Sequence, residues 1–382
     1  MRAQITFHFS AFFLTLATSA VIFSFSPSVH AAEIMQDKTE VVEAIVISID
    51  KVEKGEIEFA GLPETTQTIT ATVLSGSAKG KLITMENDYI LLDVGQKFFA
   101  NRITHSDDGN DTYTILEPNR LGSILFFAIL FLIILLIFGG IQGIRGLASL
   151  IGSLGLIMYV LIPGILHGYS PILVSLGASS IIIIVGSFIT HGFNKTTLSA
   201  VIGMIVTVTL TGILASIAVK TSFLSGYSDD ATIYLNYNTE GIINMSGLLL
   251  GGILIGLLGV LYDSAIGQAV AIEELLRANP AMSKKTLYKR ATRIGREHIG
   301  ALVNTLAIAY VGVALPLLLL FSTGTPEPIH FTINREIFAT EIVRTLVGSI
   351  GLILAVPITT FVTILILTRS KTIPQTDSGH SH

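Results

Sequence analysis

Apolar stretches follow one another between Leu121 and Thr368, and each is about as long as the hydrocarbon core of a bilayer is thick. The loops between the first three stretches are only a few residues long, so their helices should be antiparallel neighbours. The sequence therefore predicts an α-helical polytopic membrane protein with about seven transmembrane helices in a bundle of residues 121–368. The predicted spans are 122–141, 147–166, 171–190, 198–219, 244–262, 300–321 and 346–368.

Residues 33–120 show a different pattern, in which apolar and polar positions alternate between Gly, Asn and Asp punctuation. Short segments of this kind predict a small external N-terminal β domain, which could be an OB-like barrel. The candidate strands are Val41–Asp50, Gln67–Ser75, Gly80–Asn87, Lys97–Thr104 and Thr112–Glu117.

Residues 1–31 resemble a targeting segment. Arg2 precedes an apolar run from Phe7 to Phe25, and Val29 and Ala31 occupy the small-residue positions of a cleavage site. The segment is either a secretory signal peptide or an uncleaved signal anchor. Both alternatives place residues 33–120 outside the cytoplasm.

The positive charges are distributed unevenly between the two sides of the predicted bundle. Placing residues 33–120 outside leaves Lys220, Arg335 and Arg344 on the outer side. The cytoplasmic side receives Arg145, Lys195, Arg277, Lys284, Lys285, Lys289, Arg290, Arg293, Arg296, Arg369 and Lys371. This bias follows the positive-inside rule and predicts a multi-pass protein of the bacterial cell membrane with a flexible cytoplasmic tail at residues 369–382.

Composition narrows the possible functions. The chain has no cysteine, which excludes disulfides and thiolate chemistry. The β segment holds 8 Lys and Arg against 16 Asp and Glu, so nucleic acid is not an expected partner. The sequence contains no phosphate-binding loop, no G-x-S-x-G and no H-E-x-x-H motif, so we expect no enzyme, no cofactor and no metal site.

The fifth apolar stretch continues from Ile242 to Ile272 and is too long for one straight crossing, so a break or bend is expected in it. Asp263 and Gln268 lie in this continuation, and Asn304 and Thr305 lie at a similar depth in span six. These four residues are our candidates for a polar path. Backbone kinks are expected at Pro163, Pro316 and Pro357, each of which lacks an amide hydrogen inside a span.

Ser283 is placed to cap a basic amphipathic helix over residues 283–298. Its basic residues are Lys284, Lys285, Lys289, Arg290, Arg293 and Arg296. We expect this helix to bind anionic lipid at the cytoplasmic face of the bilayer. The alternative is a gate whose position responds to membrane charge or to an ion below the bundle. At the outer interface, Glu341 and Arg344 are three residues apart on one helical face and can form an ion pair.

Three groups of motifs resemble the YibE/F-like multi-pass membrane proteins. The first is Pro163-Gly-Ile-Leu-His-Gly-Tyr-Ser-Pro171 with His191-Gly-Phe-Asn-Lys195-Thr-Thr. The second runs from Asp263 through Glu274-Leu-Leu-Arg-Ala-Asn-Pro280, Ile294-Gly-Arg-Glu-His298, Asn304-Thr-Leu and Ala309-Tyr310 to Leu315-Pro-Leu-Leu. The third is Glu341-Ile-Val-Arg344 with Val356-Pro-Ile-Thr-Thr360. The resemblance implies an external N-terminal segment and a helical membrane bundle, but it implies no particular activity.

Two functions remain open. One is a permease or channel-like transporter of an unidentified ion or small solute, driven by an ion gradient because the chain has no ATPase motif. The other is a non-transporting membrane scaffold or sensor whose external β domain binds a partner. A homo-oligomer or a membrane partner protein is compatible with either. A continuous polar cavity between spans five, six and seven would favour transport, whereas a dry, closed bundle would favour the scaffold.

Overall fold

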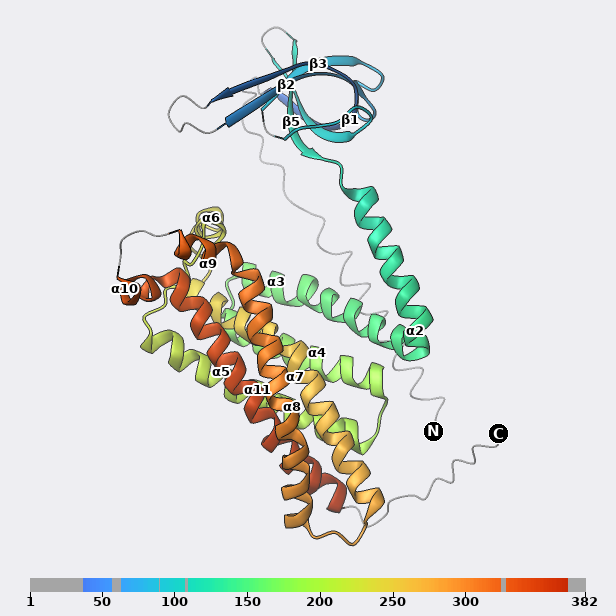
Figure 1. The fold of residues 1–382 in the computed structure, drawn as a ribbon, viewed down its shortest axis with the longest axis vertical. Coiled ribbons are helices and arrows are strands. Elements are labelled where there is room, and N and C mark those ends of the chain that lie inside the picture. The colour runs from blue at the N-terminus through green and yellow to red at the C-terminus, as the bar shows by residue number, and fades with distance from the viewer. Residues whose placement is uncertain (1–36, 57–62, 89, 107–108, 324–327, 370–382) are drawn as a thin grey trace. The chain divides into compact units, whose positions relative to one another are not determined.

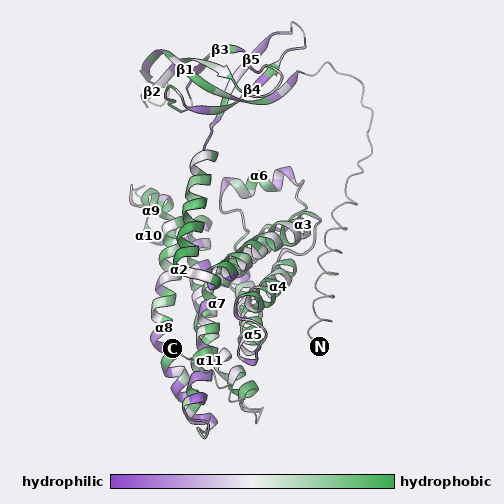
Figure 2. Ribbon diagram, turned by 90° about the vertical axis from the view of Figure 1, so that its right-hand side faces the viewer, coloured by the Kyte–Doolittle hydropathy of each residue, from purple (hydrophilic) through white to green (hydrophobic). Residues whose placement is uncertain are grey.

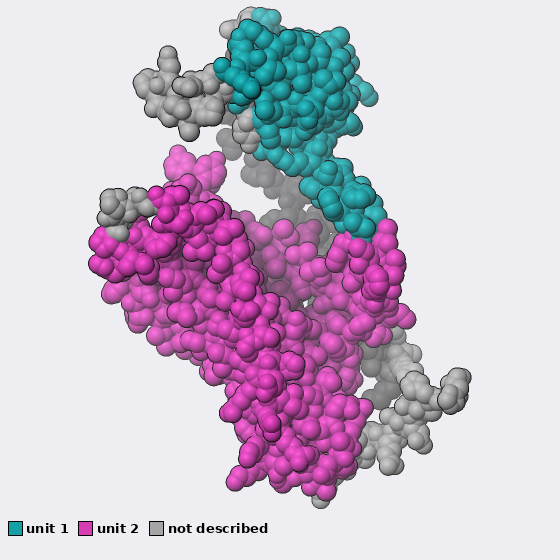
Figure 3. Space-filling model, in the orientation of Figure 1, with its two compact units in different colours: residues 1–130 teal, residues 131–382 magenta. Residues whose placement is uncertain are grey.

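The computed structural model describes residues 37–369 except 57–62, 89, 107–108 and 324–327. The predicted signal segment and the tail beyond residue 369 therefore lie outside the described residues. The chain divides into two compact units, Met1–Leu130 and Phe131–His382 (Figure 3).

The β domain is a half-barrel made of one antiparallel sheet with the strand order β3-β2-β1-β4-β5. Its strands are β1 (Lys38–Glu56), β2 (Pro63–Val73), β3 (Leu82–Asn87), β4 (Lys97–Thr104) and β5 (Asp111–Pro118). The five predicted strands are confirmed, although β1 is longer than expected. Irregularities between Val46 and Ser48 and between Ile49 and Lys51 bend β1, which pairs with both β2 and β4. Val42, Ala44, Ile69 and Phe98 fill the concave face.

The helices of the chain lie in and around a bundle (Figure 1). They are α2 (Leu121–Leu156), α3 (Ile162–Leu166), α4 (Pro171–His191), α5 (Lys195–Thr221), α6 (Asp230–Asn238), α7 (Met245–Ala278), α8 (Lys284–Val313), α9 (Leu315–Ser322), α10 (Ile329–Asn334) and α11 (Glu336–Arg369), and a π-helical turn η1 (Ile157–Leu161) separates α2 from α3. The short helices α6 and α10 lie in loops for which the sequence predicted no helix.

Within the described residues, five helices are long and apolar enough to cross a membrane, or six if the bent pair α8 and α9 is one span. The sequence predicted about seven because it treated 122–141 and 147–166 as separate spans. In the structure they lie in one helical stretch, Leu121–Leu166, in which two helices meet at a kink at Gly140 (φ 51°, ψ −141°), close to the predicted end of the first span at residue 141. Its 46 residues correspond to about 70 Å of helix, roughly twice the hydrocarbon thickness of a bilayer.

The expected break in the fifth span was wrong, because α7 is a single helix of 34 residues. Neither proline nor a residue with positive φ interrupts it. Its extra length instead packs at one end of the bundle, where Ile272 and Leu276 join Leu287 of α8 and Ile364 of α11 in one buried cluster. The predicted basic helix is likewise the first half of the continuous helix α8, and Ser283 caps it by accepting a hydrogen bond from the Thr286 amide.

The three predicted proline kinks have different outcomes. Pro163 is the second residue of α3, which begins where the π-helical turn η1 ends. Pro316 lies in the first turn of α9, whose axis makes an angle of 67° with that of α8. These two prolines therefore mark real irregularities. Pro357, in contrast, lies inside α11, which runs through it without a break.

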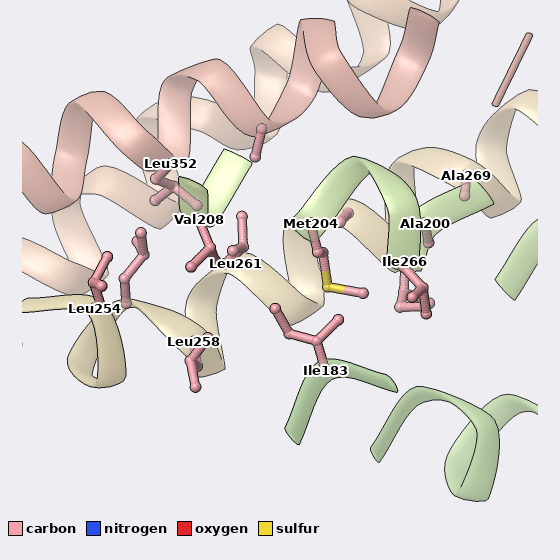
Figure 4. Packing of buried hydrophobic residues seen from close by; sticks show 14 of the residues in the cluster. Ile183, Ala200, Met204, Val208, Leu254, Leu258, Leu261, Ile266, Ala269 and Leu352 are labelled. Carbon is pink, nitrogen blue, oxygen red and sulfur yellow. The ribbon is translucent and has the colours of Figure 1, made fainter. Parts of the chain in front are cut away.

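The centre of the bundle is apolar. Leu254, Leu257 and Leu261 of α7 are fully buried against Met204 of α5 and Leu352 of α11 (Figure 4). Helices α7, α8 and α11 run side by side, and the hydrophilic residues of α7 and α8 gather near one end (Figures 1 and 2). We call this the basic end: α4, α7 and α11 end there, and α5 and α8 begin there.

Candidate functional site

Small and hydroxyl-bearing side chains line the contact between α5 and α11. They are Thr196, Ser199, Gly203, Thr207 and Thr211 of α5 and Gly351, Thr359, Thr360 and Thr363 of α11. We call these residues, together with Gln268 of α7, the polar seam. All of them are buried. A methyl group at Gly203 would lie 2.7 Å from Thr359 Oγ1 and 3.0 Å from Thr359 Cα, so a glycine there lets the two helix backbones approach closely.

Hydrogen bonds connect the seam to the basic end of the bundle. Thr196 Oγ1 donates to Glu273 Oε2 of α7 at 2.6 Å. One turn further in, Ser199 Oγ lies 3.1 Å from Thr363 Oγ1 and 2.7 Å from the Thr196 carbonyl oxygen. The buried side chains of α5, α7 and α11 are therefore joined from the surface inward.

Gln268 extends this arrangement to α8. Its Nε2 donates to Thr360 Oγ1 at 2.7 Å and to the Ala291 carbonyl oxygen at 2.9 Å. Gly295 leaves room for the amide, since a methyl group there would lie 2.7 Å from Gln268 Oε1. Gln268 thus ties three helices together at one buried point.

A small pocket of about 110 Å³ opens where the seam reaches the basic end. Its polar lining comes from His191, Asn194, Thr196, Thr197 and Glu273. Asn194 caps α5 by accepting a hydrogen bond from the Thr197 amide, and Glu273 also pairs with Arg277 at 2.8 Å. The pocket therefore brings a carboxylate, an imidazole, an amide and hydroxyl groups to the entrance of the seam.

The structure does not bring the four path candidates together. Gln268 is 4% exposed, whereas Asp263, five residues earlier on α7, lies on an exposed face of that helix. Asn304 and Thr305 are also exposed, and Thr305 Oγ1 donates to the carbonyl oxygen of Ala301 in its own helix. Only Gln268 belongs to the polar seam.

The other predicted groups are placed as follows. Arg344 Nη1 lies 2.9 Å from Glu341 Oε1, so the structure brings this ion pair together. The six basic residues Lys284, Lys285, Lys289, Arg290, Arg293 and Arg296 are all exposed. Among the described residues, no group of three or more His, Asp and Glu side chains could hold a metal ion.

Several buried hydroxyl groups of the bundle have no hydrogen-bond partner among the described residues. They are Ser175, Ser179 and Ser187 of α4, Ser264 of α7, Thr292 and Tyr310 of α8, and Thr340 and Thr359 of α11. A buried polar group without a partner costs about 1–3 kcal/mol, so a bundle that only had to be stable would favour apolar side chains here.

Sequence reasoning missed the contribution of α5 and of Glu273 to this site. One signal was readable: Thr196, Ser199, Gly203, Thr207 and Thr211 recur every three or four residues along one face of span four. The partner of that face was not readable, because Ser199 and Thr363 are 164 residues apart in sequence.

Long apolar helices that enclose a polar seam define the class of the protein, an integral membrane protein with a helical bundle. The family model of the YibE/F-like proteins matches residues 127–369, more than half of the chain. The protein belongs to the YibE/F-like family. No curated protein matches the chain, and no solved structure does.

Proposed function

We propose that the protein is a permease or channel-like transporter of an ion or small polar solute, and that the solute passes along the polar seam. The observation that supports this most directly is the hydrogen-bonded series from Glu273, at the open pocket, to Ser199 and Thr363 in the bundle. Hydroxyl and amide groups can exchange the hydrogen bonds they make with one another for bonds to a passing solute. The absence of an ATPase motif suggests that an ion gradient drives this transport.

The proposal includes an orientation in the bacterial cell membrane. The cations around the basic end suggest that this end is cytoplasmic and that the β domain is external. The strand order of the half-barrel is compatible with an OB-like fold, which would suit an external domain that binds a ligand or partner. We propose no enzymatic activity for either unit.

The second candidate function is a non-transporting scaffold or sensor. Leu254, Leu257 and Leu261 are fully buried, and a bundle with such an apolar centre is what a scaffold would need. In the transport proposal these leucines block the solute in one conformation of the bundle, and a second conformation opens the path. Only a functional measurement separates the two candidates.

That measurement is solute flux into proteoliposomes, with a panel of monovalent and divalent cations, anions and small metabolites. The transport proposal expects flux of at least one solute above the level of protein-free vesicles. Gln268→Met keeps the side-chain volume and removes the amide, so it should reduce this flux by at least tenfold. Asp263→Asn, on the exposed face of the same helix, is the matched control and should transport like the wild type. Absence of flux for the whole panel would favour the scaffold.

A further inference from the structure

Four basic residues of α8 form a stripe along one side of the helix. Lys285, Lys289, Arg293 and Arg296 are separated by four, four and three residues, a spacing that places them on one face. All four are exposed, and together they cover about 16 Å of helix axis. We call them the basic stripe.

The apolar face of this part of α8 is already covered by protein. Leu287 and Ala291 are 0% exposed and pack in one cluster with Ile272 of α7 and Ile364 of α11. Gly295, on the same face, meets Val356 of α11. The segment therefore cannot lie flat on a bilayer with its apolar side in the lipid, and any ligand of the stripe must be recognised by its charge.

No ion pair among the described residues involves the stripe, although Glu297 follows Arg293 by four residues on the same helix. The ion pairs described near this end join Arg277 to Glu273 and Glu274, so these two carboxylates are already engaged. The first turn of α8 has no acidic residue, although the positive end of the helix dipole favours one there. Like charges four residues apart also repel. A bound anion would reduce the repulsion between these like charges and would interact favourably with the positive end of the helix dipole.

The depth of the stripe distinguishes between possible anions. Gly295 touches α11 at Val356, and Leu287 shares a buried cluster with Leu367. The segment of α8 that carries the stripe on its opposite, exposed face therefore lies alongside a part of α11 that belongs to a candidate membrane span ending at Thr368. A soluble polyanion has poor access to the flank of a lipid-embedded helix. Lipid phosphates lie at that boundary, and flexible Lys and Arg side chains can reach them.

We propose that the basic stripe binds the headgroup of an anionic phospholipid at the rim of the bundle. The guanidinium groups of Arg293 and Arg296 can each donate two hydrogen bonds to phosphate oxygens, and the two lysines add positive charge toward the end of the helix. This binding does not depend on transport.

The test uses the full-length protein, freed of lipid in neutral detergent, and counts retained lipids by native mass spectrometry. Phosphatidylglycerol should bind at least tenfold more tightly than phosphatidylcholine, and less tightly at high salt. The quadruple variant Lys285→Gln, Lys289→Gln, Arg293→Gln, Arg296→Gln should lose this preference. A control with the same charge loss in the β domain, at Lys38, Lys54, Lys79 and Lys97, should keep it.

Two results would overturn the proposal. One is an unchanged preference for phosphatidylglycerol in the quadruple variant. The other is tighter binding of a soluble oligonucleotide than of phosphatidylglycerol, which would make the stripe a polyanion site. Because the quadruple variant changes only exposed side chains, its melting temperature should match the wild type. If it fails to fold, Arg293→Gln with Arg296→Gln replaces it and must show the same loss of preference.

Discussion

Asp111 holds together the end of the β domain where β4 meets β5. Its carboxylate accepts hydrogen bonds from Lys81 Nζ, Arg102 Nε and Thr104 Oγ1, each at 2.8 Å. The bond from Lys81, followed by those from Arg102 and Thr104, holds the pKa of Asp111 well below its usual range. The sequence did not reveal this role, because Lys81 comes 30 residues earlier in the chain and only the fold brings it to Asp111.

This arrangement predicts a pH dependence. Since the pKa of Asp111 is lower in the folded than in the unfolded protein, its contribution to stability is complete above the unfolded value of about 3.9 and is lost as the pH falls through the folded value. Asp111→Asn should therefore reduce amide-exchange protection in β4 and β5 at pH 7, and the difference from wild type should shrink below about pH 4. Hydrogen exchange with mass spectrometry, corrected for the intrinsic rate, measures this, and Asp93→Asn is the control. Equal protection of Asp111→Asn and wild type at pH 7 would contradict the prediction.

Hydropathy locates the helices reliably because each long apolar stretch must be covered by lipid or by another helix. It did not reveal that the stretch after Ile242 forms one unbroken helix. The helix can continue because Leu287 of α8 and Ile364 of α11 bury Ile272, and this packing is not visible in the sequence. Gln268 was recognisable from sequence as a polar residue in an apolar stretch. Its partners were not, because Thr360 comes 92 residues later.

The contact between α5 and α11 predicts a position-dependent effect of adding a methyl group to glycine. Gly203→Ala would place a Cβ within 3.0 Å of the Thr359 backbone, and such overpacking costs typically about 1–3 kcal/mol of unfolding free energy. Gly259→Ala meets nothing within 4 Å and should be neutral or stabilising by up to about 1 kcal/mol through helix propensity. Thermal unfolding in detergent compares the two. If the melting temperature of Gly203→Ala is not below that of Gly259→Ala, the close approach of α5 and α11 is not what stabilises their contact.

The distribution of charge over the whole chain predicts its orientation, with the basic end in the cytoplasm and the β domain outside. The chain has no native cysteine, so a single introduced cysteine reports its own side of the membrane. An impermeant maleimide added to intact cells should label Asp93→Cys and should leave Lys289→Cys unlabelled until the membrane is permeabilised. Labelling of Lys289→Cys in intact cells would reverse the orientation.

The central claim is that solute passes along the polar seam, and a reversible cross-link between α5 and α11 tests it most directly. The Ser199 and Thr363 hydroxyl oxygens are 3.1 Å apart, so Ser199→Cys with Thr363→Cys can form a disulfide in a chain that has no other cysteine. With a solute that the wild type carries, the oxidised double variant should lose flux in proteoliposomes, and reduction should restore it. Each single variant should be insensitive to the oxidant. A fully cross-linked protein that transports as fast as its reduced form would contradict the account.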